Sequence, residues 1–264
     1  MLGAIIGDIA GSRYEFVNCK SRDFEMMDFY CEPTDDSVMT IAIAEALQKD
    51  GDLKQNAIDE MRKWGAAYPH PMGGYGPMFS RWLFSPVPEP YGSFGNGAAM
   101  RVSACGEWGR SEDEVRRLAY DVTCVTHNHP EGIKGATVTA LCVFWARAKM
   151  PKDEIRAKVQ EYYALDFTCD TLNRDYEFDG TCRGTVPQAI VCFLESTDFE
   201  SAIRNVMYVG GDCDTMGAIT GAIAEAYYGI PENLKTVAFS ALDRIQRAAV
   251  ERFYAALEKR RAEK

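Results

Sequence analysis

The sequence lacks several features that would assign it to a specialised class of protein. It has 29 basic residues against 39 acidic ones and a formal net charge of −10, which argues against a dedicated nucleic-acid surface. It has no low-complexity tract and no internal repeat of fixed period. Its apolar start, residues 1–10, carries no basic segment and includes Asp8. That composition argues against a signal peptide and against a membrane span.

Patterned cysteines are also missing. The nine cysteines are scattered between Cys19 and Cys213, and no two of them form a C-x-x-C pair. An odd and unpatterned set favours reduced thiols over disulfides or a zinc site. The sequence therefore predicts a cytoplasmic protein.

Alternating strand patterns of convincing length are absent, whereas helical patterns run through most of the 264 residues. Helices are predicted at 2–12, 38–47, 53–68, 77–84, 112–125, 131–149, 151–164, 185–195, 198–209 and 216–226, with two more after residue 232. A loop is expected between residues 166 and 184. We predict an all-α fold, with residues 1–264 forming a single compact multi-helix domain.

Two predicted helices are rich in glycine. Residues 2–12 carry glycines at positions 3, 7 and 11, and Gly217 and Gly221 are also four residues apart. This spacing lines the glycines along one side of a helix and lets a neighbouring helix approach closely. Each Gly costs ~1 kcal/mol of helix propensity relative to Ala, so such helices must pack deep in a core. We expect the helix with Gly217 and Gly221 to lie beside the helix at 38–47.

One cluster of acids precedes the helix at 38–47, and a second precedes the helix with Gly217 and Gly221. They are Thr34-Asp35-Asp36 and Asp212-Cys213-Asp214-Thr215. An N-cap accounts for one acid of the first cluster, but it does not account for three adjacent oxygen donors. Like charges this close repel one another unless a cation lies between them. Oxygen ligands select Mg²⁺, Mn²⁺ or Ca²⁺ over zinc, so the clusters predict a binuclear metal site, with Cys213 pointing away from it.

Other segments predict a ligand site. The turn Gly95-Asn96-Gly97 enters a helix and offers free backbone N–H groups, which suit a phosphate. The segments 18–32 and 68–94 look irregular and are the expected rim of the site. His127 and His129 could together hold a transition metal, but no third nitrogen or sulfur ligand is evident, and we disfavour that interpretation.

These motifs together resemble the ADP-ribosylglycohydrolase family. The matching blocks, in the family's order, are Gly7 to Glu15, Thr34-Asp35-Asp36, Gly95 to Arg101, Thr126-His127, and Gly210 to Thr215. The resemblance implies an all-α fold around two divalent cations, Mg²⁺ or Mn²⁺. It also implies hydrolysis of the C1″ bond between ADP-ribose and an acceptor on a protein or a small conjugate.

The resemblance further implies roles for individual residues. The metal ligands would be Thr34, Asp35, Asp36, Asp212, Asp214 and Thr215. The catalytic acids would be Glu15, Asp35 and Asp212, with Glu15 activating water. The diphosphate and ribose would contact Gly95, Asn96, Gly97, Ala98 and His127. Acceptor-recognition segments vary within the family, so the acceptor stays open between arginine, serine, a nucleobase and an O-acetyl group.

Two other functions remain open at this point. One is a non-catalytic ADP-ribose binder or structural family member, which would bind ADP-ribose without turnover. The other keeps the metal site but acts on a phosphate or nucleotide ester, and would release phosphate without free ADP-ribose. The complete set of metal-site residues together with Glu15 favours the hydrolase. The oligomeric state stays open.

Overall fold

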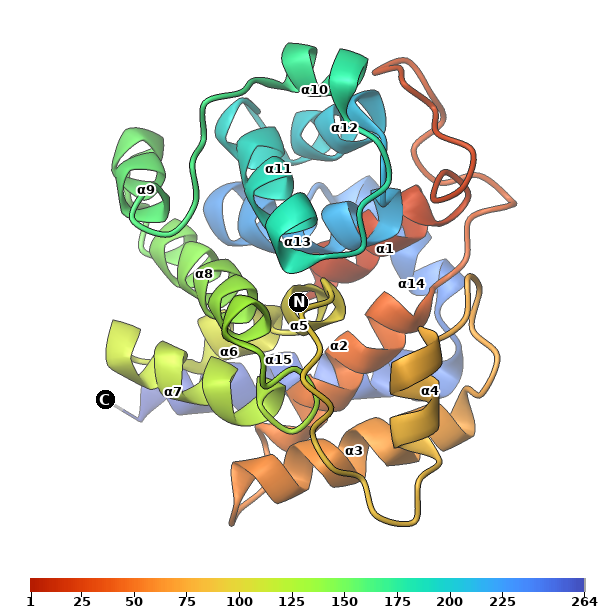
Figure 1. Cartoon of the computed structure of the whole chain (residues 1–264), viewed down its shortest axis with the longest axis vertical. Helices are drawn as coiled ribbons and strands as arrows, with labels where there is room; N and C mark the ends of the chain where they lie inside the picture. The colour runs from red at the N-terminus through yellow and green to blue at the C-terminus, as the bar shows by residue number, and fades with distance from the viewer. Residues whose placement is uncertain (264) are drawn as a thin grey trace.

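The computed structural model describes residues 1–263, which fold into helices joined by loops (Figure 1). Fifteen helices follow one another along this stretch. In it no strands form a sheet, and the only strand-like pairings are two isolated bridges, Thr34 with Met72 and Gly95 with Thr181. The prediction of an all-α fold is confirmed. Within the same residues, no helix has both the length and the apolar character needed to cross a bilayer.

The helices have the following bounds. They are α1 Leu2–Ser12, α2 Asp35–Ala46, α3 Leu53–Ala67, α4 Pro77–Leu83, α5 Gly97–Met100, α6 Ser103–Trp108, α7 Glu112–Thr123, α8 Pro130–Arg147, α9 Lys152–Val159, α10 Cys169–Asp175, α11 Cys182–Leu194, α12 Phe199–Val209, α13 Cys213–Tyr228, α14 Glu232–Ala241 and α15 Arg244–Ala262.

Two local predictions were wrong, and one helix was missed. The predicted loop at 166–184 contains α10, which begins with reciprocal capping hydrogen bonds between Thr168 and Thr171. This Thr-x-x-Thr spacing lacks the Glu or Gln of the usual capping signature. Helix α6 was not predicted, because six residues are too few to display a helical period. Helix α9 ends at Val159, short of the predicted 164.

The glycines of α1 and α13 bring these two helices into backbone contact. A Cβ atom added at Gly7 would lie 1.9 Å from the carbonyl oxygen of Gly217, and one added at Gly217 would lie 2.2 Å from the carbonyl oxygen of Gly7. Gly3 and Gly221 meet in the same reciprocal way. Close approach is therefore confirmed, but the expected partner was wrong. The glycines of α13 face α1, and not the helix at 38–47 that became part of α2.

The carboxylate of Asp8 on α1 holds the N-terminus of α2. Its Oδ2 accepts hydrogen bonds from the backbone N–H groups of Thr34 and Ser37, each at 3.0 Å, and also from the Ser37 hydroxyl. Its Oδ1 accepts from the Thr34 hydroxyl at 2.7 Å. Helix α1 thus contacts α13 through glycine and α2 through Asp8, and this double contact brings the two acid clusters together.

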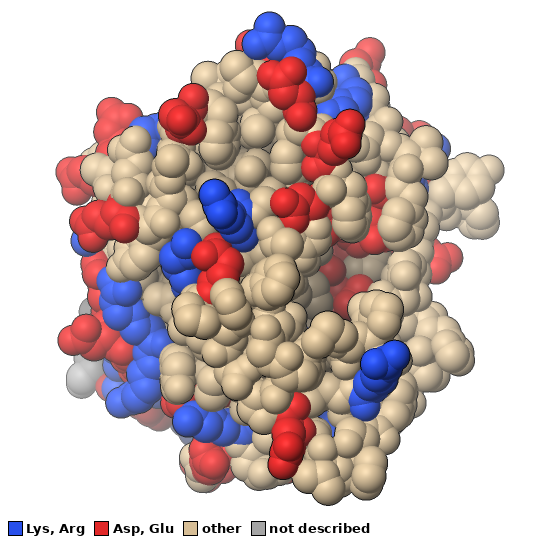
Figure 2. All heavy atoms as spheres, in the orientation of Figure 1, with Lys and Arg blue, Asp and Glu red and all other residues tan. Residues whose placement is uncertain are grey.

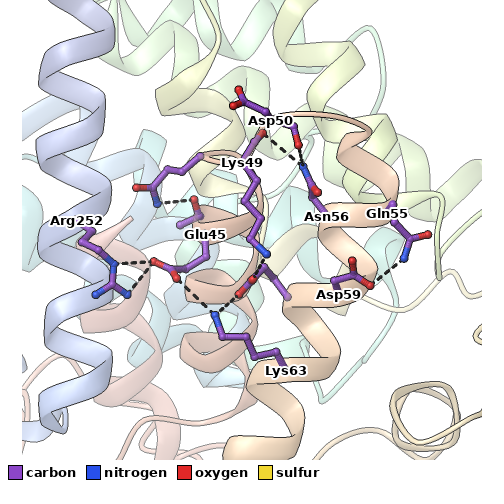
Figure 3. Close-up of polar contacts among 11 residues, drawn as sticks. Glu45, Lys49, Asp50, Gln55, Asn56, Asp59, Lys63 and Arg252 are labelled. Atoms are coloured by element: carbon purple, nitrogen blue, oxygen red, sulfur yellow. Dashed lines mark hydrogen bonds and ion pairs between the residues drawn. The ribbon is translucent and has the colours of Figure 1, made fainter.

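The opposite end of α2 is held by ion pairs (Figure 3). Glu45 accepts from Arg252 of α15 at 3.0 Å, and Lys63 of α3 lies 3.8 Å from Glu45. Glu60 of α3 is 1% exposed and pairs with Lys49 at 2.5 Å and Lys63 at 2.8 Å. Burial pushes the pKa of Glu60 up, but the hydrogen bonds from the two lysines outweigh burial and leave this pKa below its usual value. Both ends of α2 are therefore anchored.

Candidate active site

A cavity of about 560 Å³ lies at the N-termini of α2 and α13. Its walls include most of the residues that the sequence singles out, namely Glu15, Asp35, Asp36, Gly95, Asn96, Gly97, His127, Asp212, Asp214 and Thr215. Thr34 and Ala98 are fully buried and lie behind the wall. Figure 2 shows acidic side chains inside a hollow on this face, with mostly uncharged residues around them. Sequence segments about 180 positions apart therefore share one cavity.

The carboxylates within the cavity lie close enough to share a cation. Ligand oxygens of Glu15, Asp212 and Asp214 all lie within 4.8 Å of one another. Asp36 joins the group through the Thr215 hydroxyl, which donates to its Oδ2 at 3.4 Å. The other oxygen of Asp36, Oδ1, is buried, and over residues 1–263 it has no hydrogen-bond partner. A buried carboxylate oxygen without a donor is costly, and a hard cation is the partner that fits it.

The electrostatics of the cluster also fit a cation. Burial, and after it the charges of neighbouring carboxylates, hold the pKa values of Asp35, Asp36 and Asp214 well above their usual range. Burial followed by the charge of Asp212 raises the pKa of Glu15 to about 7. Of the described residues on the cavity wall, Arg101 alone carries positive charge. The protein thus gathers negative charge here that it does not itself neutralise, and the oxygen donor set suits divalent cations.

The side chain of Asn96 is hydrogen-bonded to the carboxylate of Asp212. Its side-chain amide donates to Asp212 Oδ2 at 2.6 Å and to the Thr185 hydroxyl at 3.0 Å. The backbone N–H groups of Gly95, Asn96 and Ala98 also donate within the protein, to the Ser93 hydroxyl, the Gly180 carbonyl and the Gly95 carbonyl. The expectation of free N–H groups along the turn Gly95-Asn96-Gly97 was therefore wrong for Gly95 and Asn96.

Asn18 ties the two halves of the site together, and sequence reasoning missed it. Its amide nitrogen donates to the carbonyl oxygens of Tyr14 at 2.7 Å and Gly211 at 2.9 Å, and its Oδ1 accepts from the Gly211 N–H at 2.7 Å. The chain after Glu15 is thereby joined to the turn before Asp212. Nothing around Asn18 in the sequence indicates this role, because its partner lies 193 residues away.

The prediction of the rim was half right. Residues 73–79, 91 and 93 line the cavity and belong to the segment 68–94. Over the described chain, the walls include no residue of 18–32. That segment is instead fastened to other helices, since the Lys20 ammonium donates to the carbonyl oxygens of Asn173, Tyr176 and Val209.

The two histidines have separate roles. His127 is 4% exposed, and its Nε2 lies 3.6 Å from the positions that Cβ atoms would take at Gly95 and Gly97. His129 is exposed and caps α8, where its Nδ1 accepts from the Glu131 N–H at 3.1 Å. The His129 ring lies against Phe94, with ring centroids 5.3 Å apart. This arrangement supports the view that the pair is not a chelating site.

The fold and the site together define a class of protein. It is an all-helical protein in which oxygen donors from separate helix N-termini meet in a cavity beside a glycine-containing loop. Such a donor set serves hard divalent cations. The chain belongs to the ADP-ribosylglycohydrolase family, whose sequence profile matches residues 1–263.

Individual relatives agree with this assignment. The chain is 26% identical over 313 residues to the ADP-ribosylhydrolase ARH3 of Homo sapiens, which covers 88% of this chain and 85% of that protein. It is 25% identical over 268 residues to the ADP-ribosyl-(dinitrogen reductase) glycohydrolase of Rhodospirillum rubrum, covering 88% and 85%. A solved structure described as an ADP-ribosylglycohydrolase-related protein complex superposes with a TM-score of 0.73 at 23% identity, covering 98% of this chain and 96% of that one. That superposition shows the same fold.

Proposed function

We propose that this protein is a metal-dependent hydrolase that cleaves the C1″ glycosidic bond between ADP-ribose and an acceptor, and so reverses ADP-ribosylation. The observation that carries the proposal is the convergence of five carboxylates on one cavity, where Asp36 Oδ1 is buried and has no hydrogen-bond partner among residues 1–263. The family and the names of the relatives supply the substrate class, an ADP-ribosylated protein or a small ADP-ribosyl conjugate. A cytoplasmic location is part of the proposal and is supported by the nine free cysteines.

Two divalent cations, Mg²⁺ or Mn²⁺, would be held by the two acid clusters. The ligands would be Thr34, Asp35, Asp36, Asp212, Asp214 and Thr215. Thr34 can serve although it is buried, because its hydroxyl hydrogen goes to Asp8 and one lone pair accepts from the Asp36 N–H at 3.1 Å. A hydroxyl oxygen has two lone pairs, and the second is left for a cation. When bound, the cations would orient substrate hydroxyls and polarise a water molecule.

The other chemical roles in the proposed reaction belong to side chains and backbone groups of the cavity. Glu15 faces the cavity, and across residues 1–263 no side chain donates a hydrogen bond to its carboxylate. That freedom suits a group that takes a proton from the attacking water, a role worth about 10²–10⁴ in rate. Asp35 and Asp212 would stabilise positive charge as it develops on the ribose in an oxocarbenium-like transition state. Gly97 and His127 would contact the diphosphate and ribose.

Release of free ADP-ribose is the test of this function. The protein is stripped with a chelator, restored with Mg²⁺ or Mn²⁺, and given arginine-, serine-, nucleobase- and O-acetyl-linked ADP-ribose. We expect free ADP-ribose from at least one of these substrates, no product after chelation, and recovery when the cation is returned. Free ADP-ribose is quantified by chromatography with mass detection.

Three other outcomes would contradict the proposal. ADP-ribose binding by calorimetry without turnover on any substrate would favour a non-catalytic binder. Release of phosphate without free ADP-ribose would favour a phosphate or nucleotide esterase. Equal turnover in the presence and absence of the chelator would remove the metal from the mechanism.

Gly73 gives a separate test of Glu15. A Cβ atom at Gly73 would lie 2.8 Å from Glu15 Oε2, and φ of Gly73 is +74°. Gly73→Ala is expected to displace the Glu15 carboxylate and lower kcat/KM by about 10²-fold, as an ~1 Å misplacement of a catalytic group can. The assay is steady-state hydrolysis with the substrate identified above.

Gly74→Ala is the matched control for this substitution. Gly74 has φ +79°, and no atom of the described residues lies within 4 Å of its added Cβ. Both substitutions strain the backbone by roughly 1–2 kcal/mol, so both should lower thermal stability by a similar amount. If Gly74→Ala impairs turnover as much as Gly73→Ala does, the loss comes from the backbone of the loop and not from Glu15.

A further inference from the structure

We propose that Arg101 and Thr126 hold His127 as a neutral ring protonated at Nε2, so that His127 serves the cavity as a fixed hydrogen-bond donor and not as an acid or a base. In this arrangement Arg101 is a positioning residue that acts through His127. The group that would accept this hydrogen bond is an oxygen of ADP-ribose, so its identity rests on the proposed function. The state of the ring does not rest on it.

Arg101 is a buried cation on which the carboxylates of Asp35 and Asp36 act through their charge and not through a direct ion pair. Its side chain is 0% exposed, and within residues 1–263 it forms no ion pair. One of its terminal nitrogens donates to the Thr126 hydroxyl at 2.7 Å and lies 3.3 Å from His127 Nδ1. Its Nε is buried and has no hydrogen-bond partner in the described part of the chain. A buried guanidinium is costly when it is unpaired. Here it lies over the Phe79 ring, 5.1 Å from the ring centroid, and its polar contacts are directed at the histidine and the threonine.

The contact with Arg101 determines the tautomer of His127. A guanidinium has five N–H donors and no acceptor, so the ring nitrogen that faces it must accept. The Nδ1 atom of His127 is therefore unprotonated, and the single ring hydrogen of a neutral imidazole lies on Nε2. The Thr126 hydroxyl accepts from Arg101 through a lone pair, and it lies 2.7 Å from the same Nδ1 and 3.3 Å from the Thr123 carbonyl oxygen. Its single hydrogen is assigned to Nδ1, the shorter of these two contacts.

The same surroundings keep the ring neutral. A second ring proton would sit on Nδ1, pointing at the guanidinium, and would place two positive charges in contact in a buried region. Tyr91 is the other titratable side chain against the ring, with ring centroids 5.9 Å apart. Burial raises the pKa of Tyr91 to about 12 despite the opposing charge of Arg101, so this phenol supplies no negative charge at neutral pH. Burial and then Arg101 hold the pKa of His127 well below its usual value.

The free hydrogen of the ring points at the ligand side. His127 lines the cavity, and its Nε2 lies 3.6 Å from the Cβ positions of Gly95 and Gly97. The absence of side chains at these two glycines leaves Nε2 uncovered. An N–H that stays protonated on Nε2 at every physiological pH is suited to a phosphate or hydroxyl oxygen, and the charge of Arg101 behind the ring strengthens it as a donor.

NMR of the ligand-free protein tests the state of the ring. The protein contains three histidines, so ¹⁵N-histidine labelling gives three ring systems. Those of His70 and His129, both exposed, are assigned with His70→Gln and His129→Gln and serve as internal references. We expect His127 to show a protonated Nε2 and an unprotonated Nδ1 from pH 5 to 8. A proton on Nδ1, or a doubly protonated ring in this range, would overturn the proposal.

Arg101→Met tests the cause. Without the guanidinium, Nδ1 can accept a proton, and His127 is expected to titrate within the same pH range. Circular dichroism and thermal unfolding establish whether the variant folds. If it does not fold, the wild-type spectrum still decides the state of the ring. If it folds and His127 remains neutral with the proton on Nε2, Arg101 is not the group that holds the ring.

Two substitutions at His127 test the donor role. His127→Gln keeps an amide N–H close to the position of Nε2, and His127→Leu removes it. By calorimetry we expect ADP-ribose to bind His127→Gln within about threefold of wild type and His127→Leu about tenfold more weakly, the worth of one hydrogen bond. Losses in kcat of about 10²–10⁴ in both variants would indicate proton transfer instead and contradict the inference. If wild type itself fails to bind ADP-ribose, the proposed function fails, and the spectrum of the free protein still decides the tautomer.

Discussion

Asp36→Asn is expected to lower kcat/KM by about 10³-fold and, at the same time, to make the metal-free protein more stable. Asp36 is 2% exposed, and one of its oxygens has no hydrogen-bond partner within residues 1–263. Burial, together with the neighbouring charges of Asp8 and Asp35, raises its pKa. A neutral amide removes a ligand charge that a cation needs. It also removes an ionised group that burial disfavours, so the unfolding free energy of the metal-free protein should rise by about 1 kcal/mol.

Thermal unfolding with and without a divalent cation measures both effects. Wild type should be stabilised by about 2.7 kcal/mol when the cation is present at a hundred times its Kd, and Asp36→Asn should lose most of this response. Wild-type turnover by Asp36→Asn, or an unchanged response to the cation, would exclude Asp36 as a ligand.

Glu60→Gln is the control, because Glu60 is equally buried but paired with Lys49 and Lys63 outside the cavity walls. Neutralising Glu60 should change the stability of the protein in the opposite direction from neutralising Asp36. The pKa of Glu60 is lowered in the folded protein, so its ionised form stabilises the fold above the usual carboxyl pKa, and that stability is lost as the pH falls. Glu60→Gln should therefore destabilise the protein at neutral pH and leave both turnover and the response to the cation intact.

Gly7→Ala is expected to destabilise the fold by more than about 4 kcal/mol, or to prevent folding. A methyl group at Gly7 would lie 1.9 Å from the carbonyl oxygen of Gly217. The obstacle is backbone, which has no rotamer to relieve the overlap, so α1 and α13 would have to move apart. The two acid clusters would separate with them. Chemical denaturation measures the loss of stability, and cation binding measures the loss of the site.

Gly65→Ala is the matched control for a helical glycine. A Cβ at Gly65 of α3 would meet the Leu83 methyl carbons at 2.9 and 3.0 Å, and these belong to a side chain that can rotate. The gain in helix propensity, ~1 kcal/mol, offsets the shift of Leu83, so stability should change by less than about 1 kcal/mol in either direction. If Gly7→Ala is tolerated as well as Gly65→Ala, the backbone contact between α1 and α13 is not the support that the fold requires.

The regularly spaced glycines of α1 and α13 show what a sequence pattern can and cannot predict. Their spacing predicted close helix approach, and the distances at Gly7 and Gly217 confirm it. The predicted partner of α13 was wrong. A row of small residues on a helix indicates how closely another helix can pack against it, but not which helix does so. Asp8 illustrates the same limit. Nothing near Asp8 in the sequence indicates its partners, which are Thr34 and Ser37 at the N-terminus of α2.

The residues of the site likewise fall into those that the sequence indicates and those that only the structure shows. Thr34-Asp35-Asp36 and Asp212 to Thr215 could be singled out because each cluster is contiguous in the chain. Asn18, Gly73 and Arg101 could not be assigned their roles, since those roles consist of contacts with Gly211, Glu15 and His127.

The sequence by itself determined the helical class, the start of α2 at an oxygen-rich turn, and a donor set made of carboxylates and hydroxyls. These properties depend on residue type and on neighbours within a few positions, where capping and periodicity operate. Only the tertiary structure decided that α1 would join the two clusters, which loop would cover Glu15, and which way the His127 ring would be held. Those outcomes depend on close packing between distant segments, where a shift of about one ångström separates a contact from an overlap.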